Sequence, residues 1–356
     1  MDMSYVGRLA PSPTGAQHVG NARTFLVAWL ACRQVGGKLL LRIEDLDTPR
    51  TKPGATAQAI EDLRWLGLDW DVAGPEKSFT IQSNREERYA EVLRQLKERE
   101  LVYPCTCTRA EVEDAASAPH ESILDGVIYP GTCSHRSALD SEELDHERLK
   151  YAWRFRMPNG ILSWTDSLYG KQALNAKDQL GDFVVSRSYG VTAYQLAVVI
   201  DDHDFGINHV VRGNDLMFST YRQIAIYEAL RWCTPAWLHL PLVVGPDRRR
   251  LAKRHGDTRL RSYREQGIQP EQIVGYLAET LGLRDRIESV TPTALLRELG
   301  QEQDWIGRMP RENVTKLAIK FDQNDHGELA VLQQTVLGVE QGTPEHGFLH
   351  PKFGFF

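Results

Sequence analysis

The sequence predicts an α/β fold in which helices cover an open sheet of largely parallel strands. Patterns typical of strands and helices alternate over residues 4–100 and resume at about residue 191. A strand-like start at Tyr5–Ala10 breaks into a turn of small residues and leads into a helical run, Ala22–Gln34. The apolar run Leu39–Ile43 is followed by acids, which at the C-terminal end of a parallel strand face the ligand crevice of such a sheet.

The turn between the first strand and the first helix predicts a phosphate site. It contains Ser12 and leads to His18, Gly20 and Asn21, where the helix begins. Free N–H groups and the helix dipole attract anions at this end of a helix. A histidine there can donate to a phosphate as charge builds in a transition state. For this motif alone, an ordinary βα turn with a surface histidine is the alternative.

A second segment supports the same interpretation. Residues 248–257 form a basic loop with a glycine, and they follow the apolar run Leu242–Val244. Lys253 on such a loop can bind a triphosphate and stabilise a leaving pyrophosphate. For the loop by itself, a solvated run of charges is the alternative.

Together, the two segments resemble the paired motifs of class I aminoacyl-tRNA synthetases. Residues 18–21 read His-Val-Gly-Asn where the family has His-Ile-Gly-His, and residues 250–254 read Arg-Leu-Ala-Lys-Arg where it has Lys-Met-Ser-Lys-Ser. Asn21, Arg250 and Ala252 depart from the family pattern. The resemblance implies His18 and Lys253 as catalytic residues, with Mg²⁺ accompanying the pyrophosphate. The ATP-binding residues that it implies are His18, Gly20, Asn21, Asp215 and Lys253.

Three further stretches resemble the glutamyl branch of this class: residues 39–47, 193–202 and 209–216. An arginine fork binds a carboxylate bidentately, which suits the side chain of glutamate. By resemblance, Arg212 holds that side chain, Glu44 accepts from the ammonium group and Tyr194 completes the pocket wall. The glutamate-binding residues implied are Arg8, Ala10, Ser12, Glu44, Tyr194 and Arg212.

A cluster of cysteines predicts a structural zinc site. Cys105 and Cys107 are one residue apart, and Cys133 follows after a loop. Three thiols bracketed by proline and glycine turns suit tetrahedral Zn²⁺. Chemistry alone leaves the fourth ligand open between Tyr129 and a histidine, either His120 or His135. Plain reduced cysteines are the alternative.

The glutamyl branch divides into full-length glutamyl-tRNA synthetases and shortened paralogues, the glutamyl-queuosine tRNA(Asp) synthetases. The paralogues make glutamyl-adenylate and transfer glutamate to the queuosine base in the anticodon of tRNA(Asp). They use Cys-x-Cys followed by Tyr-x3-Cys, a pattern that implies Tyr129 as the fourth ligand here. About a hundred residues follow Gly256, room for one small domain, whereas the full enzyme continues through a much larger anticodon-binding region. Both features favour the paralogue.

The predicted fold is therefore a Rossmann-like class I synthetase catalytic domain with an inserted zinc-bearing acceptor-type subdomain and a short helical C-terminal region. Residues 1–100 and 191–260 form the two halves of the catalytic domain, and residues 101–190 form the insertion. Residues 261–322 form the helical region. Residues 323–356 form a polar tail that we expect to be poorly ordered.

Composition excludes several other classes of protein. The chain has 356 residues, of which 42% are hydrophobic and 25% charged, as in ordinary globular proteins. A net charge of −6 is unusual for a non-specific nucleic-acid binder. Five cysteines, three of them clustered, indicate a reducing compartment. With no apolar run long enough to cross a membrane and no signal peptide at Met1, we expect a cytoplasmic monomer.

The expected partners are L-glutamate, ATP and tRNA(Asp) carrying queuosine. Three other functions stay open. A compact glutamyl-tRNA synthetase would charge the 3′ end of a tRNA. A catalytically silent RNA-binding or regulatory paralogue would explain the departures from the two motifs. A generic nucleotidyltransferase would share the ATP site but would not need the glutamate pocket.

Overall fold

The structure is a computed structural model that describes residues 4–13, 16–46, 52–72, 79–115, 127–187, 190–245, 258–300, 302, 304–315, 321–323 and 329–331. Its contacts divide the chain into two compact units, residues 1–316 and residues 317–356. Lys253 with its loop, and His120, lie outside the described residues.

The first half of the catalytic sheet is parallel. Its strands are β1 (Val6–Leu9), β2 (Lys38–Ile43) and β3 (Thr80–Ile81), in the order β1-β2-β3. Arg8 pairs with Leu40, and Ile43 pairs with Ile81. Helix α1 (Val19–Gln34) connects β1 to β2 and packs against both, because its apolar side chains from Val19 to Cys32 are buried. Two more helices follow, α2 (Ala55–Trp65) and α3 (Glu86–Glu98).

The second half adds a sheet in the order β7-β6-β10-β9. Strands β9 (His209–Gly213) and β10 (Ala236–Leu240) are parallel, and β10 also runs parallel to β6 (Ile161–Asp166). Strand β7 (Gly170–Asn175) closes an antiparallel hairpin with β6. The two halves meet where the N–H of Asn208 donates to the carbonyl of Val6 (3.0 Å). Helices α7 (Tyr194–Asp204) and α8 (Met217–Leu230) pack on each other, and the 3₁₀ turn η4 (Asn214–Leu216) joins β9 to α8.

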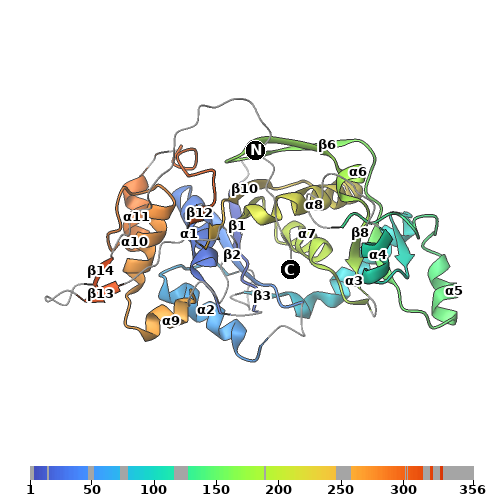
Figure 1. Ribbon diagram of the computed structural model, residues 1–356, viewed down its shortest axis with the longest axis horizontal. Coiled ribbons are helices and arrows are strands. Elements are labelled where there is room, and N and C mark those ends of the chain that lie inside the picture. Colours follow the sequence, from blue (N-terminus) through green and yellow to red (C-terminus); the bar gives the residue numbers. More distant parts are fainter. Residues whose placement is uncertain are drawn as a thin grey trace. The chain divides into compact units, whose positions relative to one another are not determined.

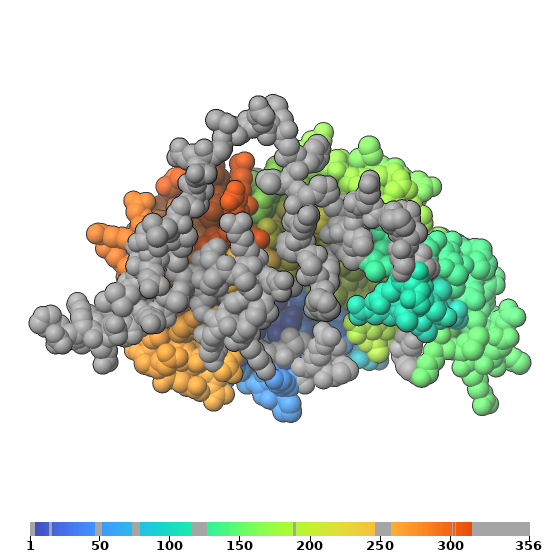
Figure 2. All heavy atoms as spheres, viewed as in Figure 1, coloured from blue at the N-terminus to red at the C-terminus, as the bar shows by residue number. Residues whose placement is uncertain are grey.

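The segment predicted as an insertion contributes to two sheets. Strands β4 (Val102–Cys105), β5 (Ala152–Phe155) and β8 (Phe183–Ser186) form an antiparallel sheet in that order. The β6–β7 hairpin instead joins the catalytic sheet through β10. The short helices are α4 (Arg109–Ala115), α5 (Asp140–His146) and α6 (Ala176–Leu180). Figure 2 shows α4 and α5, in teal and green, gathered at one flank of the face in view.

Helices dominate after residue 258. They are α9 (Leu260–Glu265), α10 (Pro270–Thr280) and α11 (Pro292–Leu299), and the last two pack beside α1 (Figure 1). Strands β11 (Val243–Val244) and β12 (Val314–Thr315) pair in parallel. In the second unit, β13 (Phe321–Gln323) and β14 (Leu329–Val331) form an antiparallel pair.

The predicted mixed α/β character is confirmed, and the predicted helices and strands differ from the observed ones by no more than a few residues at their ends. The largest shift is in α1, which begins at Val19 and not at Ala22, because His18 caps it. Among the described residues, no helix is both long enough and apolar enough to span a bilayer.

Candidate functional site

His18 sits at the N-terminal end of α1 as its cap. Its Nδ1 accepts the N–H of Gly20 at 3.1 Å, and the carboxamide oxygen of Asn21 accepts the N–H of His18 at 3.4 Å. This reciprocal pair is a capping box, which satisfies two donors of the first helical turn. Because Nδ1 is an acceptor in this network, the proton of the neutral ring is on Nε2, the nitrogen that can donate to an anion.

Gly20 is required by the position of that ring. A Cβ atom built on Gly20 would lie 3.0 Å from both Cε1 and Nδ1 of His18. Asn21, which differs from the family histidine, has a structural role as the partner in the capping box. The motif therefore sets the imidazole against the first turn of α1, where the helix dipole is positive.

Chain segments on both sides of residues 246–257 adjoin this helix end. The N–H of Val19 donates to the carbonyl of Thr258 (3.1 Å), and Arg259 forms a β-bridge with His18. Before the segment, Cβ of Val243 would be 4.0 Å from a Cβ on Gly20.

Arg212, at the end of β9, is buried and is held by neutral acceptors. Its Nε donates to His239 Nε2 (3.0 Å), its Nη1 to Gln223 Oε1 (2.9 Å) and its Nη2 to Thr220 Oγ1 (2.7 Å). No carboxylate of the described residues forms an ion pair with it. Since a guanidinium has five N–H bonds, one bond on each Nη is left to bind a ligand, the arrangement that a bidentate carboxylate requires.

Glu44, just after β2, is also enclosed but shares its charge. Its Oε1 accepts from Arg42 Nη2 at 3.0 Å and from Arg42 Nε at 3.3 Å. Burial raises the pKa of Glu44, and the charges of Arg42 and Arg8 oppose that rise. Both bonds fall on Oε1, which leaves Oε2 able to accept from a cation.

Arg8 and Tyr194 complete the group. Arg8 on β1 donates from Nη1 to the carbonyl of Val211 (2.8 Å), while its buried Nε has no hydrogen-bond partner among the described residues. Burial raises the pKa of Tyr194, as does the charge of Glu44, whereas Arg212 and Arg8 lower it. The electrostatic coupling shows that the structure brings Arg8, Glu44, Tyr194 and Arg212 together.

The remaining predicted residues described by the structure lie in the segments that follow β1 and β9. Ala10 is half-buried and Ser12 is exposed after β1, in a loop tied to β2 because the N–H of Glu44 donates to the carbonyl of Pro11 (3.1 Å). Asp215 in η4 folds back over Gly213, where a Cβ atom would lie 2.5 Å from the carboxylate oxygen. A larger residue at position 213 would force that carboxylate to move.

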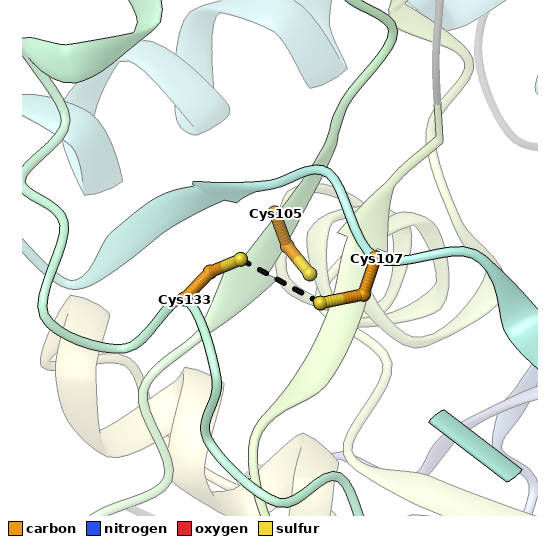
Figure 3. A group of neighbouring side chains, drawn as sticks. All are labelled: Cys105, Cys107 and Cys133. Atoms are coloured by element: carbon orange, nitrogen blue, oxygen red, sulfur yellow. Dashed lines mark hydrogen bonds between the residues drawn. The ribbon is translucent and has the colours of Figure 1, made fainter. Parts of the chain in front are cut away.

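The predicted cysteine cluster is assembled (Figure 3). Sulfur atoms of Cys105, Cys107 and Cys133 all lie within 4.8 Å of one another, and those of Cys107 and Cys133 are 3.6 Å apart. Cys105 and Cys107 come from the end of β4 and the residues after it, and Cys133 comes from a facing loop. Among the described residues, no other group of three or more His, Cys, Asp or Glu side chains is placed to hold a metal ion.

Tyr129 completes a four-cornered arrangement. Its hydroxyl oxygen lies 3.4 Å from Cys105 Sγ and 3.6 Å from Cys107 Sγ, and it accepts the N–H of Cys133 at 2.8 Å. A tetrahedral ion with metal–sulfur bonds of about 2.3 Å and a metal–oxygen bond of about 2.0 Å separates its ligand atoms by roughly 3.5–3.8 Å. These donors and spacings suit zinc. His135, the alternative ligand, is exposed and lies outside the cluster.

Sequence reasoning missed the residues that hold the charged side chains in place. His239 and Asp166 lie behind Arg212, and Asp202 pairs with Arg42 behind Glu44. The first two stand on strands β10 and β6, which the chain separates by seventy-three positions. A polar residue on the otherwise apolar, buried face of a strand is the signal that could have found them, because a buried polar group needs a partner.

Parallel strands, a first helix capped by His18 and a group of charged side chains at the strand ends are the features expected of a class I synthetase. A family model described as "tRNA synthetases class I (E and Q), catalytic domain" matches residues 5–318. The chain therefore belongs to this family of ligases.

Relatives cover most of the chain. A glutamyl-Q tRNA(Asp) synthetase of Rhodopirellula baltica is 47% identical over 86% of this chain and 95% of its own length. A glutamate–tRNA ligase 2 of Syntrophus aciditrophicus is 41% identical over 76% of this chain but only 56% of its own length. A crystal structure of a glutamate tRNA ligase from Elizabethkingia meningosepticum in complex with its amino acid aligns with a TM-score of 0.74 and 28% identity, covering 88% of this chain and 67% of that one.

Proposed function

We propose that this protein activates L-glutamate with ATP and transfers it to the queuosine base in the anticodon of tRNA(Asp). The single observation that carries the glutamate assignment is Arg212, a buried arginine without a carboxylate partner among the described residues and with one N–H on each Nη left for a ligand. The transfer to queuosine is supported by relatives that bear that name and match this chain over nearly their full length.

In this proposal, a cationic side chain binds the side-chain carboxylate of glutamate and an anionic side chain binds its ammonium group. Arg212 takes the side-chain carboxylate and Glu44 Oε2 takes the ammonium group. Arg8 Nε, which has no hydrogen-bond partner among the described residues, is a further donor in this proposal. Tyr194 donates its hydroxyl from the pocket wall. Glutamine would place an amide N–H against the donors of Arg212, and the buried site would therefore reject it.

Activation forms one bond and breaks one. The α-carboxylate oxygen of glutamate attacks the α-phosphorus of ATP in line, and the bond from that phosphorus to pyrophosphate breaks. His18 Nε2–H at the start of α1 stabilises charge on the phosphate oxygens. Little proton transfer is needed, so positioning carries the step. A hydroxyl of queuosine then attacks the acyl carbon, releases AMP and loses its proton.

Lys253 acts on the same phosphates in this proposal. It lies five positions before Thr258, whose carbonyl accepts from Val19 at the start of α1. Because five residues span at most about 18 Å, the backbone of Lys253 lies no farther than that from the backbone of Thr258 by chain length alone. Mg²⁺, when bound to the leaving pyrophosphate, neutralises its charge. Gly20, Asn21 and Asp215 line the nucleotide side of the site.

Zinc fits the cluster of Cys105, Cys107, Tyr129 and Cys133, where it would connect β4 to the facing loop. Freshly purified, reduced protein should contain about one zinc per chain by metal analysis, and Cys105→Ser with Cys107→Ser should lose it. A Tyr129→Phe variant should bind zinc more weakly, while His135→Ala should bind it as the unaltered protein does. Metal-free reduced protein would remove this assignment.

The test of function is transfer of labelled glutamate to bulk tRNA with and without queuosine, followed by nuclease digestion and mass analysis. Label on the anticodon queuosine, absent from queuosine-free tRNA, is the expected result. Label on the terminal adenosine regardless of queuosine would make the protein a compact glutamyl-tRNA synthetase. No label on either nucleoside would favour a silent paralogue.

A further inference from the structure

A buried histidine and a buried aspartate stand directly behind Arg212. His239 on β10 and Asp166 on β6 are both fully buried, with 0% and 1% of their surface exposed. Asp166 Oδ2 lies 2.7 Å from His239 Nδ1, and His239 Nε2 lies 3.0 Å from Arg212 Nε. The three side chains therefore form a continuous line from the β6–β7 hairpin to the proposed glutamate pocket.

The tautomer of His239 is determined by its neighbours. Arg212 Nε can only donate, so His239 Nε2 must accept and the ring proton must be on Nδ1. Asp166 Oδ2 accepts that proton, and Thr220 Oγ1 lies 3.2 Å from the same Nε2. The opposite tautomer would bring two N–H bonds together between His239 and Arg212.

Asp166 is itself fixed on every side by donors. Its Oδ1 accepts the N–H groups of Leu168 (2.9 Å) and Tyr169 (3.0 Å), and its Oδ2 also accepts the backbone N–H of His239 (3.0 Å). A carboxylate, which only accepts, satisfies all four bonds. An asparagine in its place would turn an N–H toward one set of donors in either orientation.

We propose that Asp166 and His239 are positioning residues for substrate recognition: they aim the Arg212 guanidinium at the side-chain carboxylate of glutamate and hold it there. The proposal rests on the proposed role of Arg212 in binding glutamate. A neutral histidine orients the guanidinium without cancelling its charge, whereas a carboxylate placed directly against Arg212 would compete with the substrate. The aspartate acts one side chain away, by fixing the tautomer.

The variants His239→Leu and Asp166→Asn test this arrangement, measured by glutamate-dependent exchange of pyrophosphate into ATP. We expect each to raise the KM for glutamate about tenfold and to leave the KM for ATP within about twofold. The amide oxygen of a glutamine can accept from Arg212 with no tautomer to be fixed. His239→Gln should therefore bind glutamate nearly as tightly as the unaltered protein does. Asp182→Asn is the matched control, since Asp182 is also buried and accepts a backbone N–H, from Met157, away from Arg212.

Three outcomes decide between the inference and the function on which it rests. If Arg212→Gln leaves the KM for glutamate unchanged, the proposed pocket is wrong. If Arg212→Gln raises that KM but His239→Leu and Asp166→Asn behave like Asp182→Asn, only the positioning role is wrong. If the two variants raise both KM values equally, the residues support the fold and not recognition, which also overturns the inference.

The unaltered protein offers a readout that does not depend on folding of a variant. Nitrogen NMR of its histidine side chains should show one histidine with an unprotonated Nε2 and a protonated Nδ1, and this signal should shift in Arg212→Gln. A protonated Nε2 on His239 would overturn the assignment.

Discussion

The two charged sides of the proposed glutamate pocket are built in different ways. Arg212 is surrounded by neutral acceptors, so its positive charge has no anion beside it among the described residues. Glu44 instead belongs to a network in which Arg42 also pairs with Asp202 and approaches Asp201, and Arg85 pairs with Asp201. Arg85 also pairs with Asp204, which extends this network to Arg88. The Arg212 side of the pocket thus presents an arginine held by neutral acceptors, and the Glu44 side presents carboxylates that several arginines share.

This difference between the two sides of the pocket predicts different roles in ligand recognition and in protein stability. An isolated buried charge gains most when a ligand arrives, because the ligand supplies its missing counter-ion. A network of buried ion pairs is already satisfied, so losing one member leaves its partner buried and uncompensated. The Arg212 side should therefore determine which amino acid binds, and the Glu44 side should matter more for folding.

The largest effect should come from Arg212→Gln. Removing two charge-assisted hydrogen bonds of about 2 kcal/mol each should raise the KM for glutamate about 10³-fold, with little change in the KM for ATP. Thermal unfolding should change little, because loss of a buried, uncompensated charge offsets the lost hydrogen bonds. Kinetics of pyrophosphate exchange and a melting curve measure both. A large loss of stability with an unchanged KM would reverse the comparison.

The opposite pattern is expected for Asp202→Asn on the other side of the pocket. Arg42 would keep its buried position but lose a charged partner, and the free energy of unfolding should fall by about 3 kcal/mol. The KM for glutamate should rise less than about fivefold, since Glu44 still accepts from Arg42. Denaturant unfolding of the purified variant gives the stability. If glutamate affinity falls as far as in Arg212→Gln, the two sides do not differ as described.

The smallest effect should come from pH. Burial holds the pKa of His239 at about 4, although Asp166 on β6 acts to raise it, and Arg212 on β9 and Arg8 on β1 lower it further. His239 thus stays neutral between pH 8 and 6, and its link to Arg212 should change the KM for glutamate less than about twofold in that range. In the unfolded chain the same histidine takes up a proton near pH 6.5.

The pKa of His239 is lower in the folded protein than in the unfolded chain. The contribution of this histidine to stability is therefore present above pH 6.5 and is lost as the pH falls toward 4. Unfolding measured from pH 7 to pH 4.5 should show this loss, and His239→Gln should show less of it. A step in glutamate affinity centred near pH 6.5 that disappears in His239→Gln would contradict a permanently neutral ring.

Much of the fold could be predicted from sequence, for local reasons. Alternating patterns located the strands, and the helical run Ala22–Gln34 located the helix that follows the first strand. The pairing of β6 with β10 could not be seen, because a hairpin inside an insertion carries no local mark of which distant strand it will join. The contact between β1 and β9 also joins segments far apart in the chain, so it could not be predicted from local patterns either.

The sequence predicted the residues proposed to bind the ligand, but it did not predict the residues that hold those side chains in position. Arginine, glutamate and histidine near strand ends could be interpreted through the chemistry that they perform. His239 and Asp166 lie on the buried faces of their strands, and their importance depends on a bond across seventy-three positions.

Arg23 shows what the helical C-terminal region contributes. This buried arginine on α1 donates to the carbonyl of Pro241 (2.7 Å) and to the carbonyl of Thr280 at the end of α10 (3.0 Å). Burial lowers its pKa to about 10. A fragment cut before α10 would leave the guanidinium with one of these two acceptors, within the same helix that His18 caps. The smallest fragment that retains this helix in place must therefore extend at least through Thr280.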